Sequence, residues 1–319
     1  MDFMIRAYLF ILLFAGVTLA GTKIESVTGQ SSLTIDYDKA TDFSGITWLG
    51  GENFMTVSDK QSAIYPLNLR IDPNTGQLLD GKFGERISVK TKFNDFEGIA
   101  YLPELKRIYI SAEGGNGIVG FDMRGDATFA VAVPDVFKRA RTNKSLESLS
   151  FGAGALWTAN EGALEGDGRP SGRGEGTVVR LQKFDASFRA VAQFAYRTEP
   201  GPAGALEAVT GVSDLLALPD GGLLALERVL TSHGLMAKIF QVDFIGATDT
   251  SAIQKLEGAV FTPVKKTLLF EKSTFTTNYE GITLGPKLAG GWRSLLLIAD
   301  SGGATKHTLM PLRIFLDAK

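Results

Sequence analysis

The sequence Asp95-Phe96-Glu97-Gly98-Ile99-Ala100-Tyr101 is typical of an acidic turn that leads into a β-strand, and residues 108–114 predict the strand that returns beside it. Together they form a predicted β-hairpin that opens on Glu97 and closes on Glu113. A single hairpin of this kind is compatible with many folds. Its recurrence decides the fold, because the same pattern is found four more times along the chain.

All five predicted hairpins open on Glu or Ser and close on Asp or Glu, and successive openings lie between 50 and 67 residues apart. The opening residues are Ser44, Glu97, Glu147, Ser213 and Glu280. The closing residues are Asp59, Glu113, Glu161, Glu227 and Asp300. A repeat of this length indicates a protein that is built from similar supersecondary units.

Further strands are predicted after each hairpin. A third strand follows every hairpin, at residues 64–72, 118–122, 178–185, 238–243 and 312–317. A fourth strand follows four of the hairpins, at residues 86–89, 128–133, 190–196 and 268–271. The last repeat has no fourth strand of its own before Lys319, and the isolated strand at residues 33–37 is free to supply it.

Four antiparallel strands in each repeat of about 50 to 65 residues predict an all-β protein with a single β-propeller, in which each repeat forms one blade. Radial repetition protects the edges of the sheets, and the N-terminal strand would close the ring by completing the last blade. We expect five blades. Six blades are the alternative, because degenerate strands could lie within residues 163–176, 199–210 and 245–264.

The first 20 residues are expected to form a cleaved signal peptide. Arg6 precedes an apolar run at residues 7–17, and Thr18-Leu19-Ala20 offers the small residues that a signal peptidase requires. The run is too short to span a bilayer comfortably. We therefore predict a periplasmic or secreted protein whose propeller domain covers residues 21–319, with no stable membrane insertion after cleavage. An uncleaved anchor and a buried strand are the alternatives.

Composition narrows the range of partners. The 319 residues are 44% hydrophobic and 21% charged, and their net charge of -2 gives no electrostatic reason to expect nucleic acid as a partner. Cys is absent, so the core must stabilise the fold without disulfides. We expect a monomer that acts on a small-molecule substrate, either an anion or an ester.

The ends of the hairpins carry the candidate site. The innermost strands of a propeller line its channel, so the opening and closing residues should meet at one rim. Three opening and five closing positions are acidic, and such a ring is unfavourable unless it is solvated, protonated or neutralised by a cation. Oxygen ligands in a chain without Cys favour a hard cation, Ca²⁺ before Mg²⁺. The alternative is that some of these acids only accept backbone hydrogen bonds at strand ends.

Roles at this rim can be assigned by residue type. The predicted metal ligands are Glu97, Glu147, Asn160, Glu280 and Asp300. The predicted catalytic residues are Glu97, Glu147, Glu280 and His307, and His307 would act as a general acid or base. The predicted substrate-binding residues are Arg228, Arg173 and Lys306, which would hold an anionic group.

Several of these segments resemble the phytase-like propeller family, described as "esterase-like activity of phytase". The segments are Glu97-Gly98-Ile99-Ala100, Glu147-Ser148-Leu149, the run from Asp220 to Arg228, Asn278-Tyr279-Glu280-Gly281-Ile282 and Leu297-Ile298-Ala299-Asp300-Ser301. The resemblance extends from about Ser44 to Asp317. It implies a secreted or periplasmic propeller that hydrolyses phosphoesters or esters. By analogy with calcium-dependent propeller phytases, acidic rim residues would hold Ca²⁺ ions that bind substrate phosphate and activate water.

The expected function is therefore that of an exported, Ca²⁺-dependent hydrolase of phosphoesters or esters. The inner hairpins contribute only Arg228 as a basic residue, which argues against phytate itself more than against hydrolysis in general. Two alternatives stay open. One is a lactonase-like propeller in which a channel Ca²⁺ polarises a carbonyl group. The other is a non-catalytic propeller that binds a glycan, a peptide or an envelope partner through its rim.

Overall fold

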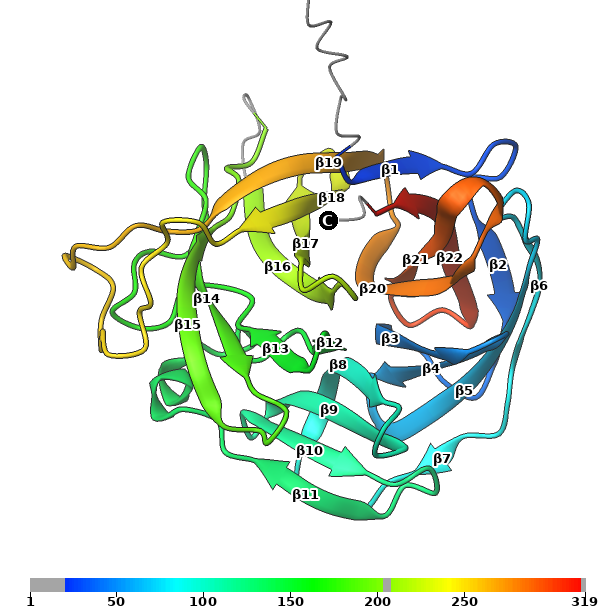
Figure 1. The fold of residues 1–319 in the computed structure, drawn as a ribbon, viewed down its shortest axis with the longest axis horizontal. Helices are drawn as coiled ribbons and strands as arrows, with labels where there is room; N and C mark the ends of the chain where they lie inside the picture. Colours follow the sequence, from blue (N-terminus) through cyan, green and yellow to red (C-terminus); the bar gives the residue numbers. More distant parts are fainter. Residues whose placement is uncertain (1–20, 203–207, 317–319) are drawn as a thin grey trace, which may run out of the picture.

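The computed structural model describes residues 21–202 and 208–316, and the predicted signal peptide at residues 1–20 lies outside them. The described chain forms five antiparallel sheets arranged in a ring, so the protein is a five-bladed β-propeller (Figure 1). The innermost strand of each sheet contacts the innermost strand of the next sheet, and these contacts continue around the whole ring. The prediction of an all-β propeller with five blades is confirmed.

The blades are numbered here in chain order, and their strands run from the channel outward. Blade 1 contains β3 (Phe43–Gly50), β4 (Asn53–Ser58), β5 (Gln61–Ile71) and β6 (Leu78–Phe83), with the short β7 (Ile87–Ser88) beside β5. Blade 2 contains β8 (Asn94–Leu102), β9 (Arg107–Gly114), β10 (Gly117–Phe121) and β11 (Ala127–Val131). Blade 3 contains β12 (Ser150–Gly152), β13 (Ala155–Ala159), β14 (Val178–Phe184) and β15 (Ala190–Arg197). Blade 4 contains β16 (Ala208–Ala217), β17 (Leu223–Thr231), β18 (Gly234–Asp243) and β19 (Lys265–Thr274).

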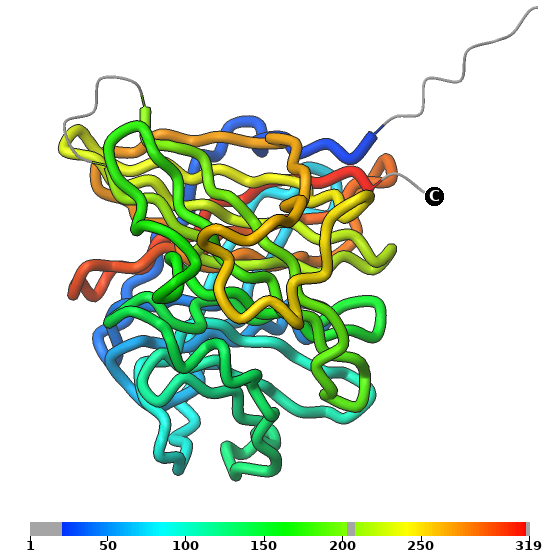
Figure 2. Tube along the Cα trace, turned by 90° about the vertical axis from the view of Figure 1, so that its left-hand side faces the viewer, coloured from blue at the N-terminus to red at the C-terminus, as the bar shows by residue number. Residues whose placement is uncertain are grey.

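Blade 5 joins the two ends of the described chain. It contains β20 (Asn278–Lys287), β21 (Trp292–Asp300), β22 (Lys306–Phe315), β1 (Lys23–Ser26) and β2 (Leu33–Asp36). Both β1 and β2 pair with β22, with Ile24 opposite Ile314 and Ile35 opposite His307. Figure 2 shows the N-terminal segment, in blue, on the same side of the molecule as the C-terminal segment, in red. The predicted closing strand is confirmed, and β1 extends it along the other half of β22.

Two details differ from the sequence-based expectation. The fourth strand of blade 1 is β6, whereas the segment predicted for that role, residues 86–89, forms only the two-residue β7. Residues 163–176 and 245–264, which could have held a sixth blade, contain no named strand in the described chain. Gly84 interrupts the sequence between β6 and β7, and its backbone N–H donates to the carbonyl of Pro66 at 2.8 Å.

The hydrophobic core lies between neighbouring blades. Val57 and Ile64 of blade 1, for example, share one apolar cluster with Phe96 and Ile110 of blade 2. A middle strand is covered by a blade on each side, which is why every residue of β13 is buried. The outermost strand β11 is instead exposed at all but its last position. The stacking of blades therefore fixes the positions of the inner strands that form the site.

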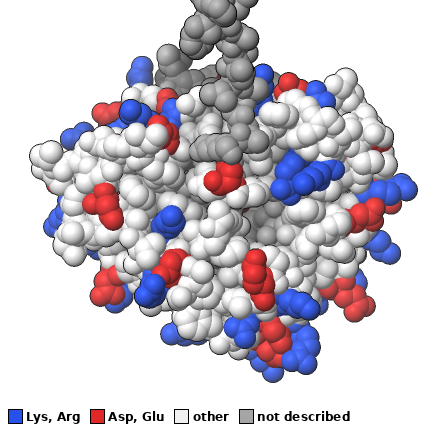
Figure 3. Space-filling model, viewed as in Figure 1, with Lys and Arg blue, Asp and Glu red and all other residues white. Residues whose placement is uncertain are grey.

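Regular helix is limited to two short 3₁₀ turns, η1 (Asp135–Arg139) and η2 (Ala289–Gly291), among the described residues. None of the helical segments that the structure describes has the length and apolar character needed to cross a membrane. On the face shown in Figure 3, basic and acidic side chains are interspersed, and neither sign gathers into a broad patch.

Candidate functional site

The opening residues of the hairpins coincide with irregularities in the inner strands. In β3, β8, β16 and β20 the register with the second strand shifts at the opening residue, which is left without a partner. In blade 3, Glu147 lies three residues before the start of β12, and its backbone N–H donates to the carbonyl of Ala159 at 3.0 Å. A β-bulge removes a residue from the ladder and redirects its side chain. The recurring sequence motif is thus a recurring change of backbone direction at the channel.

Small residues after the openers let the inner strands touch around the axis. A Cβ atom on Gly45 would lie 2.5 Å from the carbonyl oxygen of Glu97 in the next blade. A Cβ on Gly98 would overlap the backbone of Leu149, and one on Gly281 would overlap the backbone of blade 1. Only glycine permits such a close approach. The channel is therefore narrow at the level directly beyond the openers.

The side chain of Asp214, which belongs to blade 4, occupies the channel at this narrow level. Its carboxyl group accepts hydrogen bonds from the backbone N–H groups of Ile282 in blade 5, at 2.9 Å, and of Leu215, at 2.8 Å. It also accepts one from Leu149 in blade 3. Burial raises the pKa of Asp214 well above its usual range, in spite of these backbone donors. One carboxyl group thus closes the channel by joining three blades.

The sequence reasoning missed Asp214 as a site residue, although a signal was present. The residue after the opener is Gly45, Gly98 and Gly281 in three blades and Ser148 in blade 3. Blade 4 has Asp214 at the same position. One larger, polar side chain among four small ones indicates a residue that occupies the space left by the others.

Glu97, Glu113 and Glu147 form a group of carboxylates, here called the carboxylate triad, whose oxygen atoms lie within 4.8 Å of one another. Glu97 also belongs to a second such group with Asp59 and Asp95. Glu97 and Glu147 are only 8% and 7% exposed. Within residues 21–202 and 208–316, no Lys or Arg forms an ion pair with a member of the triad. The triad is thus a cluster of acidic groups that forms no ion pair with the described chain.

The environment of the triad favours protonation of its carboxyl groups. Burial is the main cause that raises the pKa of Glu97 well above its usual range, and the charges of Glu280 and Glu113 add to it. Burial and then the charges of Glu97 and Glu161 raise the pKa of Glu147 in the same way. Burial raises the pKa of Glu113 to about 7. Buried, mutually repelling carboxylates of this kind ionise readily only when a cation is bound.

Arg228 neutralises the neighbouring part of the rim. Its guanidinium group lies 2.5 Å from a carboxylate oxygen of Glu161 and forms a second ion pair with Glu280. Lys144 pairs with the other oxygen of Glu161. Burial raises the pKa of Glu161, but Arg228 and Lys144 outweigh it and the net pKa is lowered. Burial raises the pKa of Glu280 to about 7, although Arg228 opposes the shift. The rim is therefore divided into a paired part and the unpaired triad.

Three of the predicted metal ligands are not members of the triad: Glu280, which pairs with Arg228, and Asp300 and Asn160. Asp300 is half-buried at the end of β21, where burial and the nearby Asp42 raise its pKa. Asn160 is fully buried, and its amide group donates to the carbonyl of Gly162 at 2.5 Å and accepts from the backbone N–H of Arg180 at 2.9 Å. Asn160 thus stabilises the backbone after β13. The third member of the triad is instead Glu113, the closing acid of blade 2, which the sequence does not single out as a ligand.

His307 lies away from the rim carboxylates. It is fully buried between blades 5 and 1, its Nε2 is 3.1 Å from the carbonyl oxygen of Tyr37, and its ring centroid is 4.5 Å from that of Phe43. Burial lowers the pKa of His307. This position gives His307 a packing role and no contact with the triad.

The remaining residues lie at different places in the structure. Arg173 and Lys306 are exposed, and neither forms an ion pair with the described part of the chain. The closing acid Glu227 is fully buried, and it contacts Lys266 and the hydroxyl of Tyr196, each at 2.6 Å. Glu227 therefore stabilises the contact between blades 3 and 4. Arg228, the next residue, is the predicted cation that the structure brings to the rim acids.

Comparisons with known proteins add to this picture. The family model described as "Phytase-like: Esterase-like activity of phytase" matches residues 39–302. No curated protein sequence matches the chain. Among solved structures, the chain is similar to Kuenenia stuttgartiensis hydrazine synthase, with 11% identity, a TM-score of 0.40 and coverage of 84% of this chain and 59% of that chain. It is also similar to streptogramin B lyase, with 14% identity, a TM-score of 0.39 and coverage of 93% of this chain and 99% of that chain. A third similar structure is the WD40 β-propeller domain of Doa1, with 11% identity, a TM-score of 0.38 and coverage of 92% of this chain and 98% of that chain.

Proposed function

Because the chain belongs to the phytase-like family, described as "esterase-like activity of phytase", we propose that it is an exported, Ca²⁺-dependent hydrolase of phosphoesters or esters. The observation that carries the proposal is the carboxylate triad, in which three carboxylates lie within 4.8 Å of one another. Family membership supports hydrolysis as the reaction class. The triad supports a bound cation as the group that would promote hydrolysis.

The donor set of the triad fits Ca²⁺. This ion takes roughly 6 to 8 oxygen ligands, and carboxylates are its usual protein ligands. Glu97, Glu113 and Glu147 would hold the ion, and Asp59 and Asp95, which form the second group with Glu97, would supply further oxygens nearby. When bound, Ca²⁺ would polarise the ester or phosphoryl oxygen and lower the pKa of a coordinated water.

Residues of the paired part of the rim would bind and orient the substrate. Arg228 is fixed between Glu161 and Glu280, so its guanidinium group has a defined direction, and it would bind an anionic group of the substrate. Glu280 also accepts a hydrogen bond from the side-chain amide of Asn278 at 2.6 Å. With a pKa of about 7, Glu280 would hold or release a proton near neutral pH.

The proposal is tested by isothermal titration calorimetry of residues 21–319 with CaCl₂. We expect Ca²⁺ binding that Glu147→Gln weakens by at least roughly tenfold, because the variant keeps the shape of the side chain and removes one anionic ligand. Glu104→Gln removes a carboxylate from an exposed site at the other end of the inner strands and should bind Ca²⁺ as the wild type does. Absence of any divalent-cation binding by the wild type would rule out the metal-dependent mechanism.

The reaction class is tested on a matched panel of p-nitrophenyl phosphate, p-nitrophenyl butyrate and γ-butyrolactone. We expect turnover of the phosphate or the ester that requires Ca²⁺ and is lost in Glu147→Gln. Turnover of the lactone alone would favour a lactonase-like propeller instead. Calcium binding without turnover on a broad panel would favour a non-catalytic binding propeller.

A further inference from the structure

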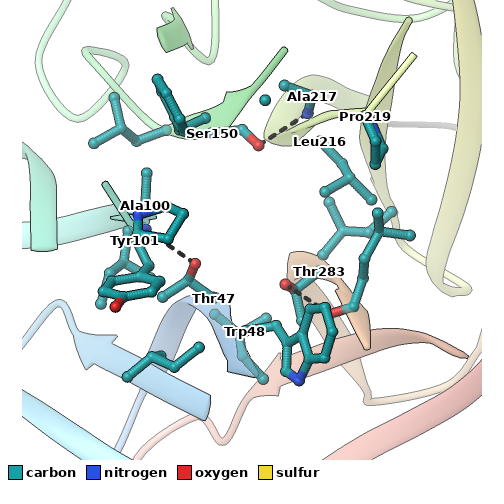
Figure 4. Close-up of a pocket in the computed structure, with 18 of the residues that line it drawn as sticks. Thr47, Trp48, Ala100, Tyr101, Ser150, Leu216, Ala217, Pro219 and Thr283 are labelled. Carbon is teal, nitrogen blue, oxygen red and sulfur yellow. Dashed lines mark hydrogen bonds between the residues drawn. The ribbon is translucent and has the colours of Figure 1, made fainter. Parts of the chain in front are cut away.

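A cavity lies at the opposite end of the inner strands from the carboxylate triad. It has a volume of about 390 Å³, and all five inner strands line it (Figure 4). The lining residues include Thr47, Ala100, Ser150, Leu216 and Thr283, one from each inner strand. Each of them lies three positions after the opening residue of its repeat. The cavity therefore lies beyond the narrow level of the channel and is of a size common for small-molecule sites, roughly 300 to 1,000 Å³.

The cavity is separate from the proposed catalytic site. Between the two, Gly45 and Gly98 bring the backbones of blades 1, 2 and 3 into contact. Asp214 bridges blade 4 to Ile282 and Leu149 on its two sides. A ligand in this cavity would therefore not touch the triad.

The walls of the cavity have few free polar groups. Thr47 and Ser150 each accept a hydrogen bond from a backbone N–H of the neighbouring inner strand, at 3.1 and 2.9 Å, as the dashed lines in Figure 4 show. Trp48, Phe151 and Pro219 add large apolar surfaces. Most of the wall is therefore suited to an apolar body rather than to a sugar or a nucleotide.

Arg293 of β21 is the single basic residue of the described chain that lines the cavity. Its guanidinium carbon lies 5.4 Å from the centre of the Trp48 ring, and its Nη2 donates to the carbonyl of Gly285 at 3.2 Å. Its Nε is buried without a hydrogen-bond partner, and none of the described carboxylates, including that of Glu104 at the cavity edge, forms an ion pair with it. A half-buried cation without a counterion is unfavourable, and an anion in the cavity would compensate it.

We propose that this cavity binds a small monocarboxylate with an apolar body, whose carboxylate pairs with Arg293 and whose body packs against Trp48. The proposal does not depend on the reaction at the triad. It assigns the propeller a second ligand site, at the far mouth of the same channel. A guanidinium group matches a carboxylate in geometry and charge, whereas a neutral ligand of the same shape would leave Arg293 uncompensated.

The test uses 4-phenylbutyrate and its neutral analogue 4-phenylbutanamide in calorimetric titrations of residues 21–319. We expect the wild type to bind the carboxylate roughly tenfold or more tightly than the amide, because a charged hydrogen-bonded pair forms only with the carboxylate. Arg293→Met should abolish this preference. Lys287→Met is the matched control, since Lys287 is exposed and opposite Arg293 on the adjacent strand but does not line the cavity.

Several outcomes would overturn the proposal. These are equal binding of the acid and the amide by the wild type, a preference that survives Arg293→Met, or a loss of 4-phenylbutyrate binding in Glu147→Gln, which would place the ligand at the triad. If Arg293→Met does not fold, nuclear Overhauser contacts between the phenyl protons of the ligand and the Trp48 indole in the wild type decide the question. Their absence from a saturated complex would also contradict the proposal.

Discussion

The carboxyl group of Asp214 accepts a hydrogen bond of 2.9 Å from the backbone N–H of Ile282, and this contact joins the inner strands of blades 4 and 5 across the channel. Because the same carboxyl group also bonds to Leu149 in blade 3, one side chain connects three blades at the axis. Burial raises the pKa of Asp214 well above its usual range, so the folded protein favours the neutral form of this carboxyl group more than the free side chain does. It also separates the two ends of the channel.

The first prediction concerns this contact. Asp214→Ala should lower the free energy of unfolding by roughly 2 to 5 kcal/mol, because it leaves buried backbone N–H groups without an acceptor. Asp214→Asn keeps the shape of the side chain and one of its two acceptor oxygens, so it should lose less stability than Asp214→Ala. Urea denaturation followed by intrinsic fluorescence measures both values. Equal stability of the Ala and Asn variants would contradict the role assigned to Asp214.

The second prediction concerns the close approach of the inner strands. Gly98→Ala should destabilise the protein by roughly 1 to 3 kcal/mol or more, because the added methyl group would overlap the backbone of Leu149. Gly172→Ala is the matched control, since nothing lies within 4 Å of a Cβ at that position. Thermal unfolding of the two variants should separate them clearly. A Gly98→Ala protein as stable as the Gly172→Ala protein would show that the strands can move apart.

The third prediction concerns the paired part of the rim. Arg228→Met should destabilise the protein by roughly 3 to 5 kcal/mol at pH 8, because it leaves the buried Glu280 without its cation and Glu161 with Lys144 alone. The loss should be smaller at pH 5, where protonation relieves part of the uncompensated charge. Arg124→Met, which breaks an exposed ion pair with Asp122, should have little effect at either pH. A loss that does not depend on pH would point to packing alone.

The fourth prediction concerns the pH dependence of stability. Burial raises the pKa of Glu113 from its usual value of 4.5 to about 7 in the folded protein. Between pH 4.5 and about pH 7, the folded state therefore binds a proton at Glu113 that the unfolded state has lost. The contribution of Glu113 to stability is therefore present at low pH and is lost as the pH rises through about 7. Without added metal, the stability of the wild type relative to Glu113→Gln should fall between pH 5 and pH 8. Denaturant titrations at the two pH values measure this difference, and a rise would contradict the assignment.

The arrangement of the blades could be predicted from the sequence because the signal is local and repeated. Glu97-Gly98-Ile99 combines an unpaired opener, a glycine for close approach and a buried apolar residue, and each property follows from the position of the motif at the inner strand. The sequence predicts the fourth strand of blade 1 at the wrong place, because β6 is buried only at its two end residues and shows no regular alternation. Outer strands contain fewer buried apolar residues than inner strands, so they are harder to recognise in the sequence.

The division of the rim could not be predicted from the sequence. The pairing of Arg228 with Glu161 and Glu280 depends on how three blades meet, and no spacing along the chain encodes it. Glu113 and Glu227 are both closing acids in the repeat pattern, yet one belongs to the triad and the other pairs with Lys266. The repeat pattern predicts where the acids lie along the chain. Their ion-pair partners depend on how the blades pack together.

The closure of the ring by β1 and β2 also constrains the order in which the protein folds. Each of blades 1 to 4 is formed by one continuous stretch of chain, whereas in blade 5 the contact between Tyr37 and His307 joins residues 270 positions apart. Contacts of such long sequence separation form late, because a large loss of chain entropy precedes them. Until β22 has been synthesised, β1 and β2 have no partner strand, and until they dock, the edge of β22 is open to pairing with another chain. The last step of folding is therefore the one most exposed to aggregation, and it coincides with the step that completes the channel.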